Sequence, residues 1–152
     1  MEREIICTNR RARHDYRILD TVEAGLVLTG SEVKSLRRKH ASLQESYARV
    51  EDDEVFLVGA NIRTYEQAGR FNHEPIRKRK LLLKRSEIRK LRRQVEAKGI
   101  TLVPLSLYFL GSWVKVEIGL ALGKRSYDKR AAIAERDAAR EMDRARKRDL
   151  HA

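Results

Sequence analysis

The sequence predicts a mainly β fold, a small closed OB-like barrel with two or three short helices and a flexible basic C-terminal tail. Apolar residues alternate along several segments, which indicates strands with one buried face. Two other segments have helical spacing, and the second of them ends at a glycine. A barrel of so few strands is typical of OB folds. We expect a flexible arm over 1–8, the barrel over 9–128 and the tail over 129–152.

The first strand is predicted over residues 16–28, where the even positions are mostly apolar. Its length predicts a bend near residues 23–25. Ser31 then follows a turn and is a candidate N-cap for a short helix that carries Val33 and Leu36.

A hairpin is predicted from residues 47–50 and 55–60, joined by the acidic turn 51–54. Residues 63–80 contain glycine, asparagine and proline and are expected to form a loop. Two final strands follow from the alternation of apolar residues over 103–109 and 114–122.

A second helix is predicted between these segments. Ser86 is its candidate N-cap, Ile88, Leu91 and Val95 form its apolar stripe, and Gly99 ends it.

The tail combines high helix propensity with few large apolar residues. Arg136, Arg140, Arg144 and Arg148 are four apart, so on a helix they form one basic stripe. Like charges at this spacing disfavour an isolated helix, which predicts a tail that is disordered when free and helical in an anionic groove.

The charge balance indicates a nucleic-acid partner. The chain holds 34 Lys and Arg against 22 Asp and Glu, a net charge of +12. Dense basic clusters repel internally, and a polyanion relieves that repulsion with release of counterions. The clusters are residues 77–93 with ten basic side chains, Lys34 with Arg37, Arg38 and Lys39, and Arg10 with Arg11 and Arg13.

Several other classes of protein lack support in the sequence. A single cysteine, Cys7, excludes an internal disulfide, and the N-terminal region has no long apolar stretch, so we expect a cytoplasmic protein. Residues 119–126 approach a phosphate-binding loop but have the wrong spacing. Cys7 with His14 is a weak nucleophile–base pair. No metal or cofactor is expected, and an RNA-processing enzyme remains only as an alternative.

Five blocks of residues resemble the bacterial small protein B family. The resemblance runs over residues 9–130, about four-fifths of the chain. The blocks are Asn9-Arg-Arg-Ala-Arg-His-Asp-Tyr16, Glu23-Ala-Gly25 with Gly30-Ser-Glu-Val-Lys-Ser-Leu-Arg37, Arg79-Lys-Leu-Leu-Leu83, Gly99-Ile-Thr-Leu-Val-Pro-Leu-Ser-Leu-Tyr108, and Gly119-Leu-Ala-Leu-Gly-Lys-Arg-Ser-Tyr-Asp-Lys-Arg130.

The resemblance implies an RNA-binding adaptor, not an enzyme, with an OB barrel. It implies binding to the tRNA-like domain of transfer-messenger (SsrA) RNA and delivery of that RNA to stalled ribosomes for trans-translation. The implied partners also include the 16S rRNA decoding centre, the empty mRNA channel and, in the charged complex, elongation factor Tu. A structural ribosomal protein or assembly factor has similar charge and size and remains the main alternative.

The resemblance, together with the basic clusters, also gives candidate site residues. Glu23 is expected to accept from ribose or base donors, and Leu82 to pack on a base; a backbone bond for Glu23 and a core position for Leu82 are the structural alternatives. The expected RNA-binding residues are Asn9, Arg11, Arg13, His14, Glu23, Lys34, Arg37, Arg79, Lys80, Leu82, Lys124 and Arg125. The expected ribosome-contacting residues are Tyr127, Asp128, Lys129, Arg130, Arg136, Arg140, Arg144 and Arg148.

Overall fold

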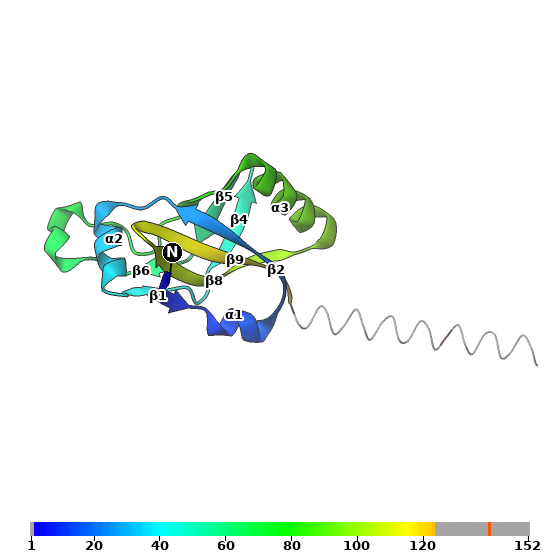
Figure 1. Cartoon of the computed structure of the whole chain (residues 1–152), viewed down its shortest axis with the longest axis horizontal. Coiled ribbons are helices and arrows are strands. Elements are labelled where there is room, and N and C mark those ends of the chain that lie inside the picture. The colour runs from blue at the N-terminus through cyan, green and yellow to red at the C-terminus, as the bar shows by residue number, and fades with distance from the viewer. Residues whose placement is uncertain (1, 124–139, 141–152) are drawn as a thin grey trace, which may run out of the picture. The chain divides into compact units, whose positions relative to one another are not determined.

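The computed structural model describes residues 2–123 and residue 140 (Figure 1). The chain divides into two units, residues 1–122 and 123–152, and the first unit contains the barrel. Within the described residues, no helix is both long enough and apolar enough to span a membrane.

Strands dominate the described part of the chain. They are Arg3–Thr8 (β1), Tyr16–Leu26 (β2), Ala41–Ser42 (β3), Tyr47–Glu51 (β4), Glu54–Val58 (β5), Asn61–Ile62 (β6), Arg79–Leu82 (β7), Thr101–Leu110 (β8) and Trp113–Gly123 (β9).

The strand pairings lead round a ring, from β8 through β4, β5, β7, β2 and β9 back to β8. This arrangement agrees with the predicted mainly β, OB-like architecture. β1 lies outside the ring, antiparallel to the second half of β8, and Ala48 of β4 pairs with Leu102 near the start of β8. The short strands β3 and β6 pair with each other.

Within residues 2–123, three α-helices and one 3-10 segment accompany the strands. In Figure 1, the second and third helices lie at opposite ends of the strands. Their bounds are Arg10–Asp15 (α1), Gly30–Arg37 (α2), Glu66–Phe71 (the 3-10 segment η1) and Arg85–Lys98 (α3).

The third helix is built as its pattern predicts. Leu91 is buried, and Ile88 and Val95 pack against the main core. Gly99 ends the helix with φ of 62°, a left-handed conformation that glycine adopts without steric cost.

Both predicted helix caps are displaced by two residues. The N-caps are Thr29 and Lys84, not Ser31 and Ser86. Each cap's backbone N–H donates to a glutamate three residues on, Glu32 at 2.8 Å in the first helix. The glutamate, therefore, was the stronger signal for the start of each helix.

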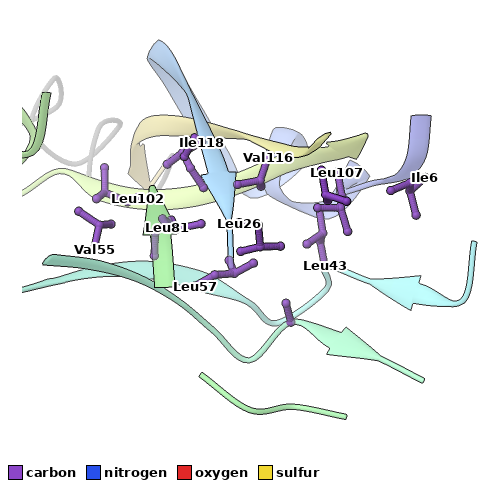
Figure 2. Close-up of a cluster of buried hydrophobic side chains, with 14 of the residues drawn as sticks. Ile6, Leu26, Leu43, Val55, Leu57, Leu81, Leu102, Leu107, Val116 and Ile118 are labelled. Carbon is purple, nitrogen blue, oxygen red and sulfur yellow. The ribbon is translucent and has the colours of Figure 1, made fainter. Parts of the chain in front are cut away.

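The main core fills the interior between the strands. Figure 2 shows aliphatic side chains from separate strands meeting there, among them Leu26, Leu81, Val55, Leu102 and Ile118. The predicted alternation is confirmed on β9, where Val114, Val116, Ile118 and Leu120 all point into this core.

A bulge in β8 divides the predicted inward row of that strand. The pairing with β9 shifts register between Pro104 and Ser106. Leu107 and Phe109 consequently join the main core, whereas Val103 and Leu105 pack in a second, smaller core with Ala12 and Ala121. The expectation of one shared face for all four residues is therefore wrong, because an inserted residue reverses which side faces inward.

The N-terminal segment is not a free arm. Residues 3–8 form β1 and pair antiparallel with β8 from Ser106 to Leu110. Ile6 is buried in the main core, and Cys7 packs against it. The segment combines charged residues with the apolar run from Ile5 to Cys7, and it pairs with the edge of β8 that β1 covers.

The predicted loop over residues 63–80 contains two elements, η1 and the start of β7. β7 pairs with both β2 and β5. The sequence pattern did not predict β7, because Arg79 takes an inward position that an apolar residue normally holds. Leu82, by contrast, faces outward.

Arg79 and Glu32 form a fully buried ion pair that joins α2 to β7. Arg79 Nε donates to Glu32 Oε2 at 2.5 Å, and both side chains are 0% exposed. The remaining Arg79 donors bond the carbonyl oxygens of Ala60 at 2.8 Å and Pro75 at 3.0 Å. Arg77 donates to Glu32 Oε1 at 2.6 Å, so one carboxylate organises three chain segments.

We expect Glu32→Gln to lower the free energy of unfolding by about 3–5 kcal/mol, because it leaves the Arg79 charge buried without its partner. Urea unfolding measures this. The control is Glu54→Gln, since Glu54 pairs with Lys80 and both side chains are about half exposed. That change should cost less than about 1 kcal/mol. Equal small losses in the two variants would contradict the role assigned to Glu32.

The same carboxylate should make stability depend on acid pH. Burial raises the pKa of Glu32, but hydrogen bonds from Arg77, Thr29 and Arg79 outweigh it and hold the pKa below its ordinary 4.5. This contribution is therefore complete above about pH 4.5 and is lost as pH falls through the lower folded-state pKa. Unfolding free energies between pH 3 and 6 should fall less steeply for Glu32→Gln than for the parent protein.

Candidate nucleic-acid interface

An apolar hollow opens on the outer face of β2, β7 and β9. Its volume is about 360 Å³, and it is lined by Gly25, Leu82, Trp113 and Lys115, among others. Leu82 is 52% exposed and Trp113 is 67% exposed. Exposed apolar surface beside a lysine fits the unstacked bases and phosphates of RNA. The core alternative for Leu82 is therefore excluded.

Gly25 makes room for this hollow. It pairs directly with Leu82 across the β2–β7 ladder. A Cβ atom at Gly25 would lie 3.2 Å from Leu82 Cβ, closer than ordinary packing allows. A larger residue here would push Leu82 outward and fill the hollow.

Glu23 lies beside the hollow and is held by side chains rather than by backbone. The Tyr108 hydroxyl donates to Glu23 Oε2, and Arg3 approaches the same oxygen at 3.4 Å. Burial, reinforced by this hydrogen bond, raises the pKa of Tyr108, so the hydroxyl keeps its proton. The alternative prediction, that Glu23 bonds to the backbone, is therefore wrong: its partners are the side chains of Tyr108 and Arg3.

Arg3 connects Glu23 to the neighbouring strands. Its guanidinium lies 4.4 Å from the Tyr108 ring centroid and donates to Glu117 at 3.0 Å. Arg13 of α1 reaches the other Glu117 oxygen at 3.6 Å. A row of charged groups therefore runs from Arg13 of α1 through Glu117 and Arg3 to Glu23.

α1 presents its other predicted residues to solvent. Arg11 lies 3.5 Å from Asp15, and its side chain is 67% exposed. His14 Nδ1 lies 3.1 Å from the same carboxylate, and its side chain is 87% exposed. Both side chains are accessible to a ligand that approaches α1.

Asn9 is buried and serves the fold. Its Nδ2 donates to the carbonyl oxygens of Leu43 at 3.1 Å and Pro104 at 3.0 Å, and its Oδ1 accepts from the Ala12 N–H at 3.1 Å. These bonds cap α1 and fasten it to two other segments. The prediction that Asn9 contacts RNA is therefore wrong, because the polar atoms of its side chain already bond to protein groups.

Arg79 requires the same correction, since its side chain is completely buried against Glu32. Lys80, by contrast, is about half exposed and lies 3.2 Å from Glu54. Lys78 likewise lies 2.9 Å from Glu51. The β7 part of the predicted basic cluster is thus neutralised by carboxylates within the fold.

Two predicted residues lie on α2. Lys34 and Arg37 are both exposed, and Arg37 lines a separate hollow beside Phe109 and Gly111. Neither has an ion pair within the described part of the chain. Their charge is therefore available to an anion.

The predicted tail residues and the neighbouring basic pair fall almost wholly outside the described residues. Arg140 alone is described, with helical backbone and an exposed side chain. Outside the described residues lie Lys124, Arg125, Tyr127, Asp128, Lys129, Arg130, Arg136, Arg144 and Arg148.

Sequence reasoning missed Arg3, Trp113 and Lys115. Trp113 and Lys115 occupy the outward positions of the alternation over 113–122, so a large aromatic residue facing solvent was the signal that could have found the hollow. Arg3 had no such signal, because its strand pairing was not predicted.

The described residues give little support to metal or thiol chemistry. None of them form a group of three or more histidine, cysteine, aspartate or glutamate side chains able to hold a metal ion. Burial raises the pKa of Cys7 to about 11, so its thiol is protonated at neutral pH.

Comparison with known proteins places this site in context. The family model described as SmpB protein matches residues 6–148. An SsrA-binding protein of Chloroflexus aurantiacus is 58% identical over 148 residues, which cover 97% of this chain and 92% of that protein. One from Acetivibrio thermocellus is 53% identical over 149 residues, covering 98% and 97% respectively.

A solved structure gives a similar result. A chain described under "tmRNA-SmpB: a journey to the center of the bacterial ribosome" is 52% identical, with a TM-score of 0.66. The match covers 78% of this chain and 83% of that one.

We expect Asn9→Ala to lower the free energy of unfolding by about 2–3 kcal/mol, because it removes a helix cap and two buried hydrogen bonds to the carbonyl oxygens of Leu43 and Pro104. Thermal and urea unfolding measure the loss. Asn61→Ala, at an exposed position, should stay within about 0.5 kcal/mol. At temperatures where Asn9→Ala remains folded, its affinity for RNA should match that of the parent. A loss of RNA affinity without any loss of stability would contradict the structural role.

Proposed function

The chain belongs to the SmpB protein family, and on that premise we propose that it is an RNA-binding adaptor for transfer-messenger (SsrA) RNA. It binds the tRNA-like domain of that RNA and delivers it to stalled ribosomes for trans-translation. The SsrA-binding relatives and the tmRNA–SmpB structure support this function. Family membership also favours it over the ribosomal-protein alternative.

The exposed hollow at Leu82 and Trp113 is the observation that carries the proposal at the level of residues. A soluble barrel gains nothing from exposing both side chains side by side unless they contact a partner. RNA recognition relies on bases that stack or pack against such surfaces.

Charged groups around the hollow complete the proposed interface. Lys115 reaches the Gly25 side of the hollow and supplies a positive charge for a phosphate. Glu23 Oε2 is engaged by Tyr108 and Arg3, which leaves Oε1 to accept from a ribose hydroxyl or a base amine. Arg3 is held in place by Glu23 and Glu117 and is about half exposed.

The remaining predicted contacts follow the same physical logic. The exposed basic side chains of α1 and α2 contribute phosphate contacts, which add affinity without sequence preference. Lys80 contributes one when a phosphate replaces its exposed partner Glu54. His14 donates to sugar or phosphate oxygens. These phosphate-contacting residues are Arg11, Arg13, Lys34, Arg37, Lys80, Lys124 and Arg125.

The tail beyond the barrel supplies the second part of the proposal. Tyr127 stacks on a base in the decoding centre, within the block from Asp128 to Arg130. The arginines at 136, 140, 144 and 148 follow the empty mRNA channel, and the tail becomes helical as its like charges are neutralised. Elongation factor Tu joins the complex when the RNA is charged.

The proposed protein binds and positions RNA without catalysing a reaction, and it works in the cytoplasm, where ribosomes lie. The barrel and the tail have separate tasks. The chain divides into its two units after residue 122, six residues before the end that the sequence predicts for the barrel. Specificity comes from the hollow, and much of the affinity comes from the exposed cations.

The test is a titration against the tRNA-like domain of SsrA RNA, with a tRNA of equal length as competitor and salt varied. We expect a clear preference for the tRNA-like domain that survives moderate salt. Equal binding to both RNAs, fading steeply with salt, would overturn the proposed function and leave only phosphate attraction.

Two variants test the hollow itself. Leu82→Ser and Trp113→Ala should each weaken binding to the tRNA-like domain about tenfold, within the range of roughly 1–3 kcal/mol for a base packed on a side chain. Their matched controls are Ile76→Ser and Phe71→Ala, at apolar positions that are 57% and 76% exposed but lie outside the hollow. Equal losses in the variants and their controls would remove the hollow from the interface.

A further inference from the structure

A basic groove lies on another flank of α2 from the apolar hollow. It has a volume of about 270 Å³ and is lined by Arg38, His40, Arg63, Tyr65 and Glu66, together with Thr64. We call it the Tyr65 groove. Arg38, His40 and Arg63 are exposed, and Tyr65 is partly buried.

The Tyr65 ring fixes the neighbouring cations in place. The Arg38 guanidinium carbon lies 4.8 Å from the ring centroid, and Lys34 Nζ lies 5.6 Å from it. Cation–π contacts of this length restrain long side chains that otherwise sample many rotamers. A ligand that binds these cations therefore loses less entropy than on a mobile surface.

Hydrogen bonds also fix the backbone around the Tyr65 groove. The Asn72 side chain accepts from the Tyr65 N–H at 2.8 Å and donates to the Tyr65 carbonyl at 2.6 Å. The Arg63 N–H donates to the His40 carbonyl at 3.0 Å, and the Ser35 hydroxyl donates to the Arg63 carbonyl at 2.6 Å. These bonds tie the segment that carries Tyr65 to α2.

The positive charge of the Tyr65 groove is not neutralised. Within the described residues, Lys34, Arg38 and Arg63 have no carboxylate within ion-pair distance, whereas Arg77, Lys78, Arg79 and Lys80 all do. Glu66 is the one acidic residue among the lining side chains. The groove keeps an excess of cations that an anionic ligand would relieve.

Lys39 is a further basic residue next to the Tyr65 groove. It follows the end of α2 with φ of 58°, a left-handed conformation that favours glycine at this position. A lysine there keeps a basic residue between Arg38 and His40 at a conformational cost that glycine would avoid.

The Tyr65 groove is distinct from the hollow at Leu82 and Trp113. Val33 of α2 lines that hollow, whereas Lys34 and Arg38 contact Tyr65. At about 100° of rotation per residue, Lys34 and Arg38 project roughly 100° and 140° away from Val33 around the helix. The two surfaces therefore flank α2 and leave room for two RNA segments at once.

We propose that the Tyr65 groove is a second RNA-binding subsite that takes one unpaired nucleotide. Its base stacks on the Arg38 guanidinium, which itself lies over Tyr65, and a flanking phosphate contacts Arg63. RNA is favoured over an acidic protein segment because a planar guanidinium held on an aromatic ring offers a stacking surface that carboxylates do not use. The proposal rests on the proposed function for the class of ligand.

The test is binding of a labelled single-stranded RNA octamer to the full chain already saturated with the tRNA-like domain of SsrA RNA. Fluorescence anisotropy follows the octamer at several salt concentrations. We expect a ternary complex. Arg38→Ala with Arg63→Ala should weaken octamer binding at least tenfold. It should reduce the slope of log affinity against log salt by about 0.7, the value for one phosphate contact to a single strand, because Arg63 is the member of the pair that contacts a phosphate.

Matched variants separate the subsite from general charge. Arg49→Ala with Arg92→Ala removes the same net charge at exposed positions that already pair with Glu51, Asp53 and Glu96, and should change octamer binding less than twofold. Tyr65→Leu should weaken binding about tenfold, while Tyr65→Phe, which keeps the ring, should stay within twofold. Thermal melts establish that each variant is folded.

Several outcomes would overturn the proposal. They are failure of the octamer to bind the preloaded chain, equal effects of the two arginine pairs, or displacement by polyglutamate with Tyr65→Leu unchanged, which would assign the groove to acidic protein segments. Loss of tRNA-like-domain binding with Arg38→Ala and Arg63→Ala would show that the two surfaces are one. If the parent chain binds the octamer here but does not prefer the tRNA-like domain, the proposed function fails and this subsite stands.

Discussion

The buried carboxylate of Glu32 is the constraint on which the arrangement of both surfaces depends. It receives hydrogen bonds from Arg79, Arg77 and the Thr29 backbone, so it fixes where α2 begins and how it lies against β7. Two buried charges are costly unless each is fully paired, and here Arg79 also bonds two carbonyl oxygens. With α2 held in this way, one of its flanks borders the apolar hollow and the other carries the cations around Tyr65.

Much of the fold followed from periodicity, and the exceptions have physical causes. The alternating strand β9 and the end of α3 at Gly99 were predicted correctly, because local pattern and burial agree there. β8 was predicted as a strand, but its bulge divides the predicted inward row between two cores. β7 was missed because Arg79 occupies a core position that only its distant partner Glu32 makes tolerable. β1 was missed because its apolar run from Ile5 to Cys7 is short and is flanked by charged residues, so its burial depends on pairing with the distant β8.

At the candidate site too, predictions were wrong where a residue's partners lie far away in the sequence. Resemblance identified Glu23 and Leu82, which the fold brings to one face. It also suggested Asn9 and Arg79 as ligands, although both side chains are buried by protein partners that lie far away in the sequence. The prediction of a free basic cluster was also wrong at Lys78 and Lys80. The carboxylates that pair with these lysines come from the β4–β5 hairpin, which lies far from them in the sequence.

The bulge in β8 has a consequence for the energetics of local opening. It divides the interior into a large core and a small one, and α1 rests on the small one through Ala12, with Val103, Leu105 and Ala121 beneath it. A cooperative unit that buries so little apolar surface opens at a lower free energy than the barrel around the larger core. α1 is consequently able to detach and re-dock while the barrel stays intact. Amide hydrogen exchange in α1 would then report on RNA engagement independently of global unfolding.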